Sequence, residues 1–300
     1  MFVGRSPWTA ADALVRMVVR GRLPDQGVRR GRGRPPQVKT LIVNADDFGF
    51  TRDTNAGIIE AHTHGILTAT TLMADGAAFD DAVRLAREYP SLDIGVHLVL
   101  VGQAPFPMTV TQLARDITLG RIAILEALRA QVRKIVDAGI QPSHMDTHKH
   151  THLLPPVLEA VAQISEEFKI PWVRRPFDAP LAYQGVSLGK RATNAAMGIM
   201  RGTASRILTS YGCRFTDHFA GFQITGAYGA EELAALIRQL PEGSTEFMCH
   251  PAICGEELRA ARTRLKESRE RELRALTSPE VRAAAQEARV RLANYRSTNS

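Results

Sequence analysis

The chain has 300 residues, of which 44% are apolar and 23% are charged, so it has the composition of a soluble globular protein. This composition excludes fibrous and integral membrane classes, and three cysteines are too few for a disulfide framework, which favours a reducing cytoplasm. The formal net charge is +7, but residues 1–39 carry nine basic and two acidic side chains, whereas residues 40–300 carry 29 of each.

Residues 1–37 are predicted to be a basic, flexible N-terminal extension. Its apolar stretch at 8–19 is shorter than the roughly 20 residues of a membrane span, and Arg16 interrupts it. We favour an extension without function, or a start codon assigned too early, over a polybasic segment that contacts anionic lipid. Nucleic acid is not expected as a partner. The expected location is the cytoplasm, with peripheral contact at the inner face of the membrane as the alternative.

From residue 40 onwards, short apolar runs alternate with stretches of helical periodicity. Strands are predicted at 40–45, 66–74, 93–100, 142–146, 171–175, 221–225 and 244–250. Helices are predicted between them at 53–65, 78–89, 121–138, 154–168 and 230–239. Residues 176–215 are expected to form a helical insertion, and residues 255–295 to form charged surface helices. This alternation predicts one α/β domain, 38–300, whose mostly parallel strands form a closed or nearly closed barrel.

Polar side chains lie at the carboxyl ends of four predicted strands, where the chemistry of α/β folds gathers. They are Asp46 and Asp47, His97, Asp146 and His148, and His250. Neighbouring residues on a regular strand point to opposite faces, so Asp46 and Asp47 can share one site only if the strand ends between them. Two adjacent carboxylates are costly unless a cation or a proton separates them, which favours a metal on one and a base role for the other.

The stretch "SHMDTHKHTHLLPP" places four histidines at every second position. Residues two apart on a strand are separated by about 6.6 Å, so His144, His148, His150 and His152 cannot all bind one metal. His148, just after the strand, is the best ligand candidate, whereas His144 lies deeper and is better placed to orient a neighbour by a hydrogen bond. One carboxylate with two imidazoles leaves positions open for water and a substrate oxygen, as in metal-dependent hydrolases.

Five stretches together resemble the YdjC-like carbohydrate deacetylases, including their chitooligosaccharide and hopanoid-biosynthesis (HpnK) branches. They are "LIVNADDFGF", "NAGIIEAHTHGILTATTLM", "IGVHLVL", "SHMDTHKHTHLLP" and "TEFMCHPA", in this order and spacing. The resemblance covers about residues 39–255. It implies a distorted TIM-like (β/α) barrel that binds one divalent metal ion and hydrolyses the acetamide of N-acetylated sugars.

The resemblance also implies roles for individual residues. It places the metal on Asp47, His97 and His148. Asp46 matches the general base and His250 the acid. The arginine of "VRRP" is expected to support the base, and we assign Arg174 over Arg175; His218 is expected to lie on the substrate side. Zinc and magnesium are the metals expected first, and a homodimer is the oligomeric state that the resemblance suggests.

Two other functions remain open from the sequence. One is another metal-dependent hydrolase such as a phosphoesterase, whose sites usually gather two or three metals. The other is a barrel without activity that binds carbohydrate or lipid, although binding needs no general base. Within the deacetylase prediction, the N-acetylated sugar can be a soluble oligosaccharide or a lipid-linked N-acetylglucosamine.

Overall fold

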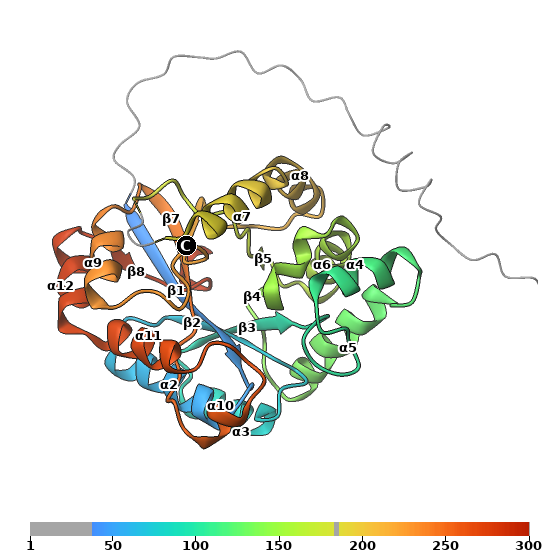
Figure 1. Ribbon diagram of the computed structural model, residues 1–300, viewed down its shortest axis with the longest axis horizontal. Coiled ribbons are helices and arrows are strands. Elements are labelled where there is room, and N and C mark those ends of the chain that lie inside the picture. Colours follow the sequence, from blue (N-terminus) through green and yellow to red (C-terminus); the bar gives the residue numbers. More distant parts are fainter. Residues whose placement is uncertain (1–37, 183–185, 300) are drawn as a thin grey trace, which may run out of the picture. The chain divides into compact units, whose positions relative to one another are not determined.

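The computed structural model describes residues 38–182 and 186–299, so the extension predicted at 1–37 lies outside the described residues. A parallel sheet forms the centre of the fold (Figure 1). Its strands are β1 (Lys39–Phe48), β2 (Ala69–Leu72), β3 (Asp93–Leu98), β4 (His144–Thr147), β5 (Trp172–Val173), β6 (His218–Ala220), β7 (Gly243–Cys249) and β8 (Arg291–Leu292). They pair in the order β5-β4-β3-β2-β1-β7-β6, and β8 pairs with β1.

Single bridges link the two edges of the sheet and curl it into a barrel. Trp172 of β5 pairs with Arg214, and Asp178 pairs with Phe219 of β6. The amide of Ala179 donates to the carbonyl oxygen of Phe219 at 2.7 Å. Because regular strands do not complete this part of the wall, the barrel is distorted. The predicted fold class, an α/β barrel of parallel strands, is confirmed.

Helices surround the sheet on its outer face (Figure 1). They are α2 (Arg52–His64), α3 (Phe79–Glu88), α4 (Val110–Thr118), α5 (Ile124–Asp137), α6 (Pro155–Phe168), α7 (Leu188–Gly198), α8 (Arg201–Ser210), α9 (Ala230–Arg238), α10 (Glu256–Ala260), α11 (Glu267–Thr277) and α12 (Pro279–Glu287), with 3-10 turns η1 (His148–Leu153) and η2 (Ser297–Asn299). In α5, Leu128, Val132 and Ile135 recur at helical spacing and are buried, so one face of the helix covers the barrel.

The two faces of β1 separate the outer core from the barrel interior. Leu41, Val43 and Ala45 belong to the large core that the sheet forms with the helices. Ile42, on the other face, packs in a small separate cluster with Ala69, Trp172 and Tyr295. Since Asn44 and Asp46 follow on the face of Ile42, the barrel has an apolar plug at one end and polar side chains towards the carboxyl ends of its strands.

One predicted strand is wrong. Residues 221–225 form a turn, and β6 lies just before them at His218–Ala220. Gly221 has a φ of 120° and packs so closely on β7 that a β-carbon would lie 2.4 Å from the carbonyl oxygen of Met248. The carboxylate of Asp178 accepts the amides of Phe222 and Gln223 at 3.2 and 2.8 Å, which holds the chain in the turn.

The predicted helical insertion, 176–215, contains α7 and α8, and residues 255–295 contain α10, α11 and α12. Among residues 38–182 and 186–299, no helix combines the length and the hydropathy that crossing a bilayer requires.

Candidate metal and catalytic site

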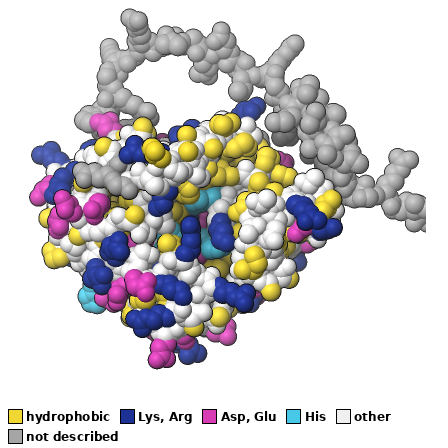
Figure 2. All heavy atoms as spheres, in the orientation of Figure 1, with side chains coloured by type: hydrophobic (Ala, Val, Ile, Leu, Met, Phe, Trp, Pro, Cys, Tyr) yellow, Lys and Arg dark blue, Asp and Glu magenta, His cyan; other side chains and the backbone are white. Residues whose placement is uncertain are grey.

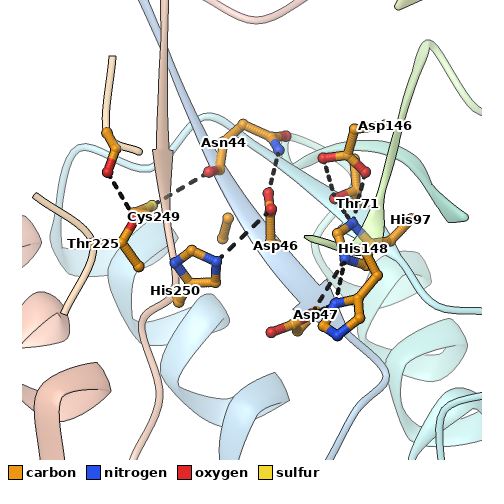
Figure 3. A network of polar contacts seen from close by, with 12 residues as sticks. Asn44, Asp46, Asp47, Thr71, His97, Asp146, His148, Thr225, Cys249 and His250 are labelled. Atoms are coloured by element: carbon orange, nitrogen blue, oxygen red, sulfur yellow. Dashed lines mark hydrogen bonds and ion pairs between the residues drawn. The ribbon is translucent and has the colours of Figure 1, made fainter. Parts of the chain in front are cut away.

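A bulge in β1 brings Asp46 and Asp47 to the same site (Figure 3). Ala45 pairs with Thr70 and Phe48 with Leu72, so β1 has one more residue than β2 over this stretch. Asp47 adopts a φ of 69°, which turns its side chain to the side on which Asp46 lies. A strand end between the two aspartates is therefore not needed: β1 continues to Phe48, and the bulge brings both side chains to one site.

Asp47, His97 and His148 form a compact group, called here the open triad. Asp47 Oδ1 lies 3.3 Å from His97 Nε2 and 3.3 Å from His148 Nδ1, and the two nitrogens are 3.3 Å apart. Asp47 Oδ1 is buried and has no hydrogen-bond partner among the described residues. Three ligand atoms therefore meet around one point, and one of them is a buried oxygen that no other group satisfies.

The open triad fits a divalent cation. Zinc binds imidazole nitrogen and carboxylate oxygen at about 2.0–2.2 Å, so one ion can contact all three atoms that lie 3.3 Å from one another. Ligand atoms of Asp46, His97 and Asp146 also lie close together. In that second group a guanidinium already binds both carboxylates, so we favour the open triad as the place where a metal could be held.

Asp146 fixes the orientation of His97. The Nδ1 atom of His97 lies 2.6 Å from Asp146 Oδ1 and 3.2 Å from the hydroxyl of Thr71. Burial disfavours a charged imidazole, but Asp146 outweighs burial and raises the pKa of His97 to about 10. Binding of a cation at Nε2 would release that proton, because only the neutral ring nitrogen is a ligand. A carboxylate behind a ligand histidine is a common arrangement in metal sites.

Arg174 holds three carboxylates, and these four residues are called here the Arg174 cluster. Its Nη1 and Nη2 donate to both oxygens of Asp46 at 2.8 and 2.7 Å. Its Nη1 is also 2.6 Å from Asp146 Oδ2, and its Nε donates to Glu246 Oε1 at 2.6 Å. Burial would raise the pKa of Asp46, but the charge and hydrogen bonds of Arg174 hold that pKa well below its usual range. The prediction that Arg174 rather than Arg175 lies beside Asp46 agrees with this geometry.

His250 lies on the other side of Asp46 from the open triad (Figure 3). Its Nε2 is 3.8 Å from Asp46 Oδ2, and its Nδ1 is 3.9 Å from Glu272 Oε2. The backbone amide of His250 donates to the same Glu272 oxygen at 2.6 Å. Burial lowers the pKa of His250, which leaves the ring neutral near pH 7. The ring is thus positioned beside the carboxylate predicted to act as base.

Two buried residues of α11 reach the site, and the sequence did not indicate them. Arg269 Nη2 lies 2.5 Å from Asp47 Oδ2, and Glu272 accepts the amide of Gly226 at 2.8 Å besides that of His250. Arg269 is 3% exposed and Glu272 is 1% exposed, although we predicted surface helices in this region. The two residues are three apart and so share one helix face, which is the only signal in the sequence that could have suggested them.

The remaining histidines of the 144–152 stretch lie away from the open triad. His144 Nε2 lies 2.8 Å from Asn44 Oδ1, and Asn44 Nδ2 donates to Asp46 at 3.3 Å, so His144 orients Asn44 beside Asp46. His152 Nδ1 lies 2.6 Å from the hydroxyl of Thr147. His150 has a φ of 52°, which turns it towards Phe222, 5.7 Å between ring centroids.

The structure does not place His218 with the other predicted site residues. It is the first residue of β6, pairs with Thr245 in β7 and is level with Leu41 of β1. The Nε2 atom of His218 lies 3.2 Å from the carbonyl oxygen of Glu242. His218 is therefore near the amino-terminal end of the strands, whereas the open triad lies at the carboxyl end. The substrate-side role that the resemblance implies for His218 stays a prediction.

Comparisons with known proteins agree with this geometry. Residues 40–287 match the family model described as YdjC-like protein. A carbohydrate deacetylase from Brevibacillus brevis is 31% identical over 267 residues, which is 85% of this chain and 98% of that protein. A chitooligosaccharide deacetylase from an Enterobacter species is 33% identical over 271 residues, 86% of this chain and 98% of that protein.

A solved structure shares the fold. It is that of a proposed cellobiose-phosphate cleavage protein from Enterococcus faecalis, with a TM-score of 0.67 and 27% sequence identity over 87% of this chain and 99% of that one. The family match spans both aspartates, the three site histidines, Arg174 and α11. The chain belongs to the YdjC-like protein family.

Proposed function

We propose that this protein is a metal-dependent carbohydrate deacetylase, which hydrolyses the acetamide of an N-acetylated sugar and releases acetate. The names of its relatives support the reaction class. The observation that carries the proposal is the different environment of two adjacent carboxylates. Asp47 has a free oxygen facing two imidazoles, whereas Asp46 is bound by Arg174 and faces His250.

Asp47, His97 and His148 would hold one divalent metal ion. When bound, such an ion supplies Lewis acidity to the acetamide carbonyl and to the attacking water. Zinc and magnesium are the metals that we expect first, although a two-histidine, one-carboxylate site also accepts manganese, cobalt or nickel. Asp146 and Thr71 would keep the Nε2 of His97 directed to the metal position through its Nδ1.

Asp46 would accept the proton of the attacking water. Because Arg174 holds the pKa of Asp46 low, this carboxylate stays ionised throughout the physiological range. A carboxylate with a low pKa is a weak base, so it can take a proton only from a water that is already acidified. Activity is therefore expected to depend on the metal even though the base is in place.

His250 would donate a proton to the departing amine, which is otherwise a very poor leaving group. Because the ring is neutral at rest, His250 would first take up the proton that Asp46 has removed from the water; its Nε2 lies 3.8 Å from Asp46 Oδ2. The lowered pKa then makes the imidazolium a strong acid towards the amine. Glu272, which accepts the backbone amide of His250, would position the residue. His144 would contribute indirectly, because it reaches Asp46 only through Asn44.

The test is acetate release from N,N'-diacetylchitobiose and from an N-acetylglucosaminyl lipid, with metal-loaded and with chelated protein. Release is expected only with metal, and the better substrate identifies the soluble or the lipid-linked class. Asp46→Asn should bind metal normally and lose about 10²- to 10⁴-fold in turnover. Asp137→Asn, at an exposed position of α5, is the matched control and should retain full activity.

Two outcomes would contradict the proposal. Full activity of Asp46→Asn would remove the assigned base. Release of phosphate from a phosphorylated disaccharide, with no acetate from either N-acetylated substrate, would instead favour the phosphoesterase that the sequence left open. That readout is included because the name of the Enterococcus relative refers to a sugar phosphate.

A further inference from the structure

The segment between Asp178 and Asp217 carries positive charges only. Residues 179–216, called here the basic insertion, contain no acidic side chain. They contain Lys190, Arg191, Arg201, Arg206 and Arg214. Residues 40–300 hold 29 basic and 29 acidic side chains, and without the basic insertion 24 basic and 29 acidic ones remain. The rest of residues 40–300 is thus slightly acidic, whereas the basic insertion has five positive charges and no negative one.

Helix α7, inside the basic insertion, presents one row of apolar side chains to solvent. Leu188, Ala192, Ala195 and Ile199 lie at positions i, i+4, i+7 and i+11, which is one face of a helix, and all four are exposed. Leu188 is 85% exposed and Ile199 is 81% exposed. The opposite face carries half-buried side chains, and α7 has no buried residue. Met197, on the opposite face, packs against the core, so the exposed row is a second apolar face in addition to the usual one.

Helix α7 is tied to the wall of the site. Lys190 Nζ donates to the carbonyl oxygen of Thr225 at 2.7 Å. Thr225 belongs to the turn whose next residue, Gly226, donates its amide to Glu272. Figure 2 shows hydrophobic side chains gathered over α7 and α8, beside the hollow in which histidine side chains are visible. The exposed apolar stripe is therefore held next to the entrance of the site.

We propose that the basic insertion docks on a bilayer that contains anionic lipid, with the apolar stripe of α7 at the level of the headgroups. An interfacial helix combines an apolar face with flanking basic residues, and each lysine or arginine near an anionic leaflet adds to binding. Arg191, Arg201 and Arg206 are exposed and supply that charge. Docking would bring the entrance of the site to the lipid surface. The inference does not depend on the proposed reaction.

A second copy of the chain is a poorer occupant of this surface. A twofold interface brings the same patch of both subunits together, so the basic insertion would face its own positive charge. An anionic bilayer offers the opposite charge and a continuous apolar layer that a single row of side chains can enter.

The first experiment follows the polarity around position 199 in the full chain. The three natural cysteines are buried, so Ile199→Cys introduces one accessible thiol for an environment-sensitive fluorophore. Phosphatidylglycerol vesicles should shift its emission to the blue, and phosphatidylcholine vesicles should not. The same label at Val136→Cys, a 40% exposed position of α5, is the matched control and should not respond. This readout separates the basic insertion from the basic residues 1–37, which are present in every sample.

A second experiment changes charge. Arg201→Gln with Arg206→Gln should weaken partitioning of the labelled protein into phosphatidylglycerol vesicles by about 25-fold, at about fivefold for each basic residue. Arg133→Gln with Arg271→Gln removes the same charge from exposed positions of α5 and α11 and should change partitioning less than twofold, as an order-of-magnitude expectation from screening. An unshifted probe at 199 on protein that sediments with the vesicles would overturn the proposal. So would a blue shift that depends on protein concentration without vesicles, which would identify a second copy as the occupant.

Discussion

The open triad and the Arg174 cluster lie side by side, but their carboxylate oxygens differ in whether a hydrogen-bond donor binds them. In the Arg174 cluster, one guanidinium engages Asp46, Asp146 and Glu246 through three of its nitrogens at 2.6–2.8 Å. In the open triad, Asp47 Oδ1 has no hydrogen-bond partner among the described residues. In the first arrangement the guanidinium engages all three carboxylates. In the second, Arg269 engages only Oδ2 of Asp47, and Oδ1 faces the two imidazoles.

From this difference we expect the Arg174 cluster to contribute to the stability of the fold and the open triad to bind a ligand. A buried charge network is strongly destabilised when one partner is removed. A group with a free ligand atom and a partly exposed histidine tolerates loss of that histidine, because little burial is lost with it. Stability and metal affinity should therefore respond to different substitutions, although Asp146 contacts both groups.

The largest effect is expected for the centre of the Arg174 cluster. Arg174→Met leaves three buried carboxylates without their cation and should lower the free energy of unfolding by about 3–5 kcal/mol. Arg175→Met is the control, because Arg175 is only half-buried and donates to Ser205 and to backbone carbonyls. It should cost about 1 kcal/mol. Urea denaturation of both variants measures the difference, and equal losses would mean that the cluster is not the stabilising group.

Substitutions in the open triad should change the affinity for metal rather than the free energy of unfolding. His148→Ala removes one of three ligands, so its affinity for zinc should fall at least about 100-fold, more than loss of an outer partner costs. Its side chain is 27% exposed, so the unfolding free energy of the metal-free protein should change little. Calorimetric titration of metal-free protein checks this, with His250→Ala as the control that keeps all three ligands. Unchanged affinity of His148→Ala would exclude the open triad as the metal site.

The pH dependence of the free energy of unfolding should reflect the ionisation of Glu246. Three carboxylates share one guanidinium, and burial raises the pKa of Glu246 to about 7 although Arg174 lowers it. A carboxyl group with a raised pKa binds its proton more tightly in the folded state, so stability falls as pH rises from about 4.5 to about 7. The loss relative to Glu246→Gln should reach about 3 kcal/mol. Parallel unfolding curves for wild type and variant across this range would contradict the shift.

The smallest effect is expected for Asp146, which contacts both the open triad and Arg174. Asp146→Asn keeps the three ligands of the open triad but changes the partner of His97, so metal affinity should fall about ten- to 100-fold. Asn44→Ala is the control, since Asn44 contacts Asp46 and His144 and does not contact His97. A larger loss for Asn44→Ala than for Asp146→Asn would show that the metal is held on the Asp46 side.

Much of the site could be predicted because it is built from strand ends. Parallel strands bring their carboxyl ends to one edge, so the positions of Asp46, Asp47, His97, His148 and His250 followed from the alternation of elements. The family and the fold class are confirmed. The roles of these residues, the metal, a homodimer and membrane contact by residues 1–37 stay predictions.

The remainder of the site depends on contacts that periodicity does not encode. Arg269 and Glu272 lie in "ESRERELRALT", whose charges are typical of a solvated helix, and only packing against the barrel shows that they are buried. The bulge at Asp46 and Asp47 depends on how β1 pairs with β2, and the residues of β1 alone do not predict that pairing. The strand predicted at 221–225 was wrong because the three residues of β6 give too short a pattern to locate.

The position of α11 in the chain has a consequence for synthesis. Both aspartates, the three site histidines and Arg174 precede residue 251, but the cation that binds Asp47 and the carboxylate that holds His250 come later, at 269 and 272. A nascent chain that has emerged from the ribosome only as far as His250 contains every proposed reacting group but lacks α11, which neutralises Asp47. The order of translation thus makes a complete site one of the last features to form.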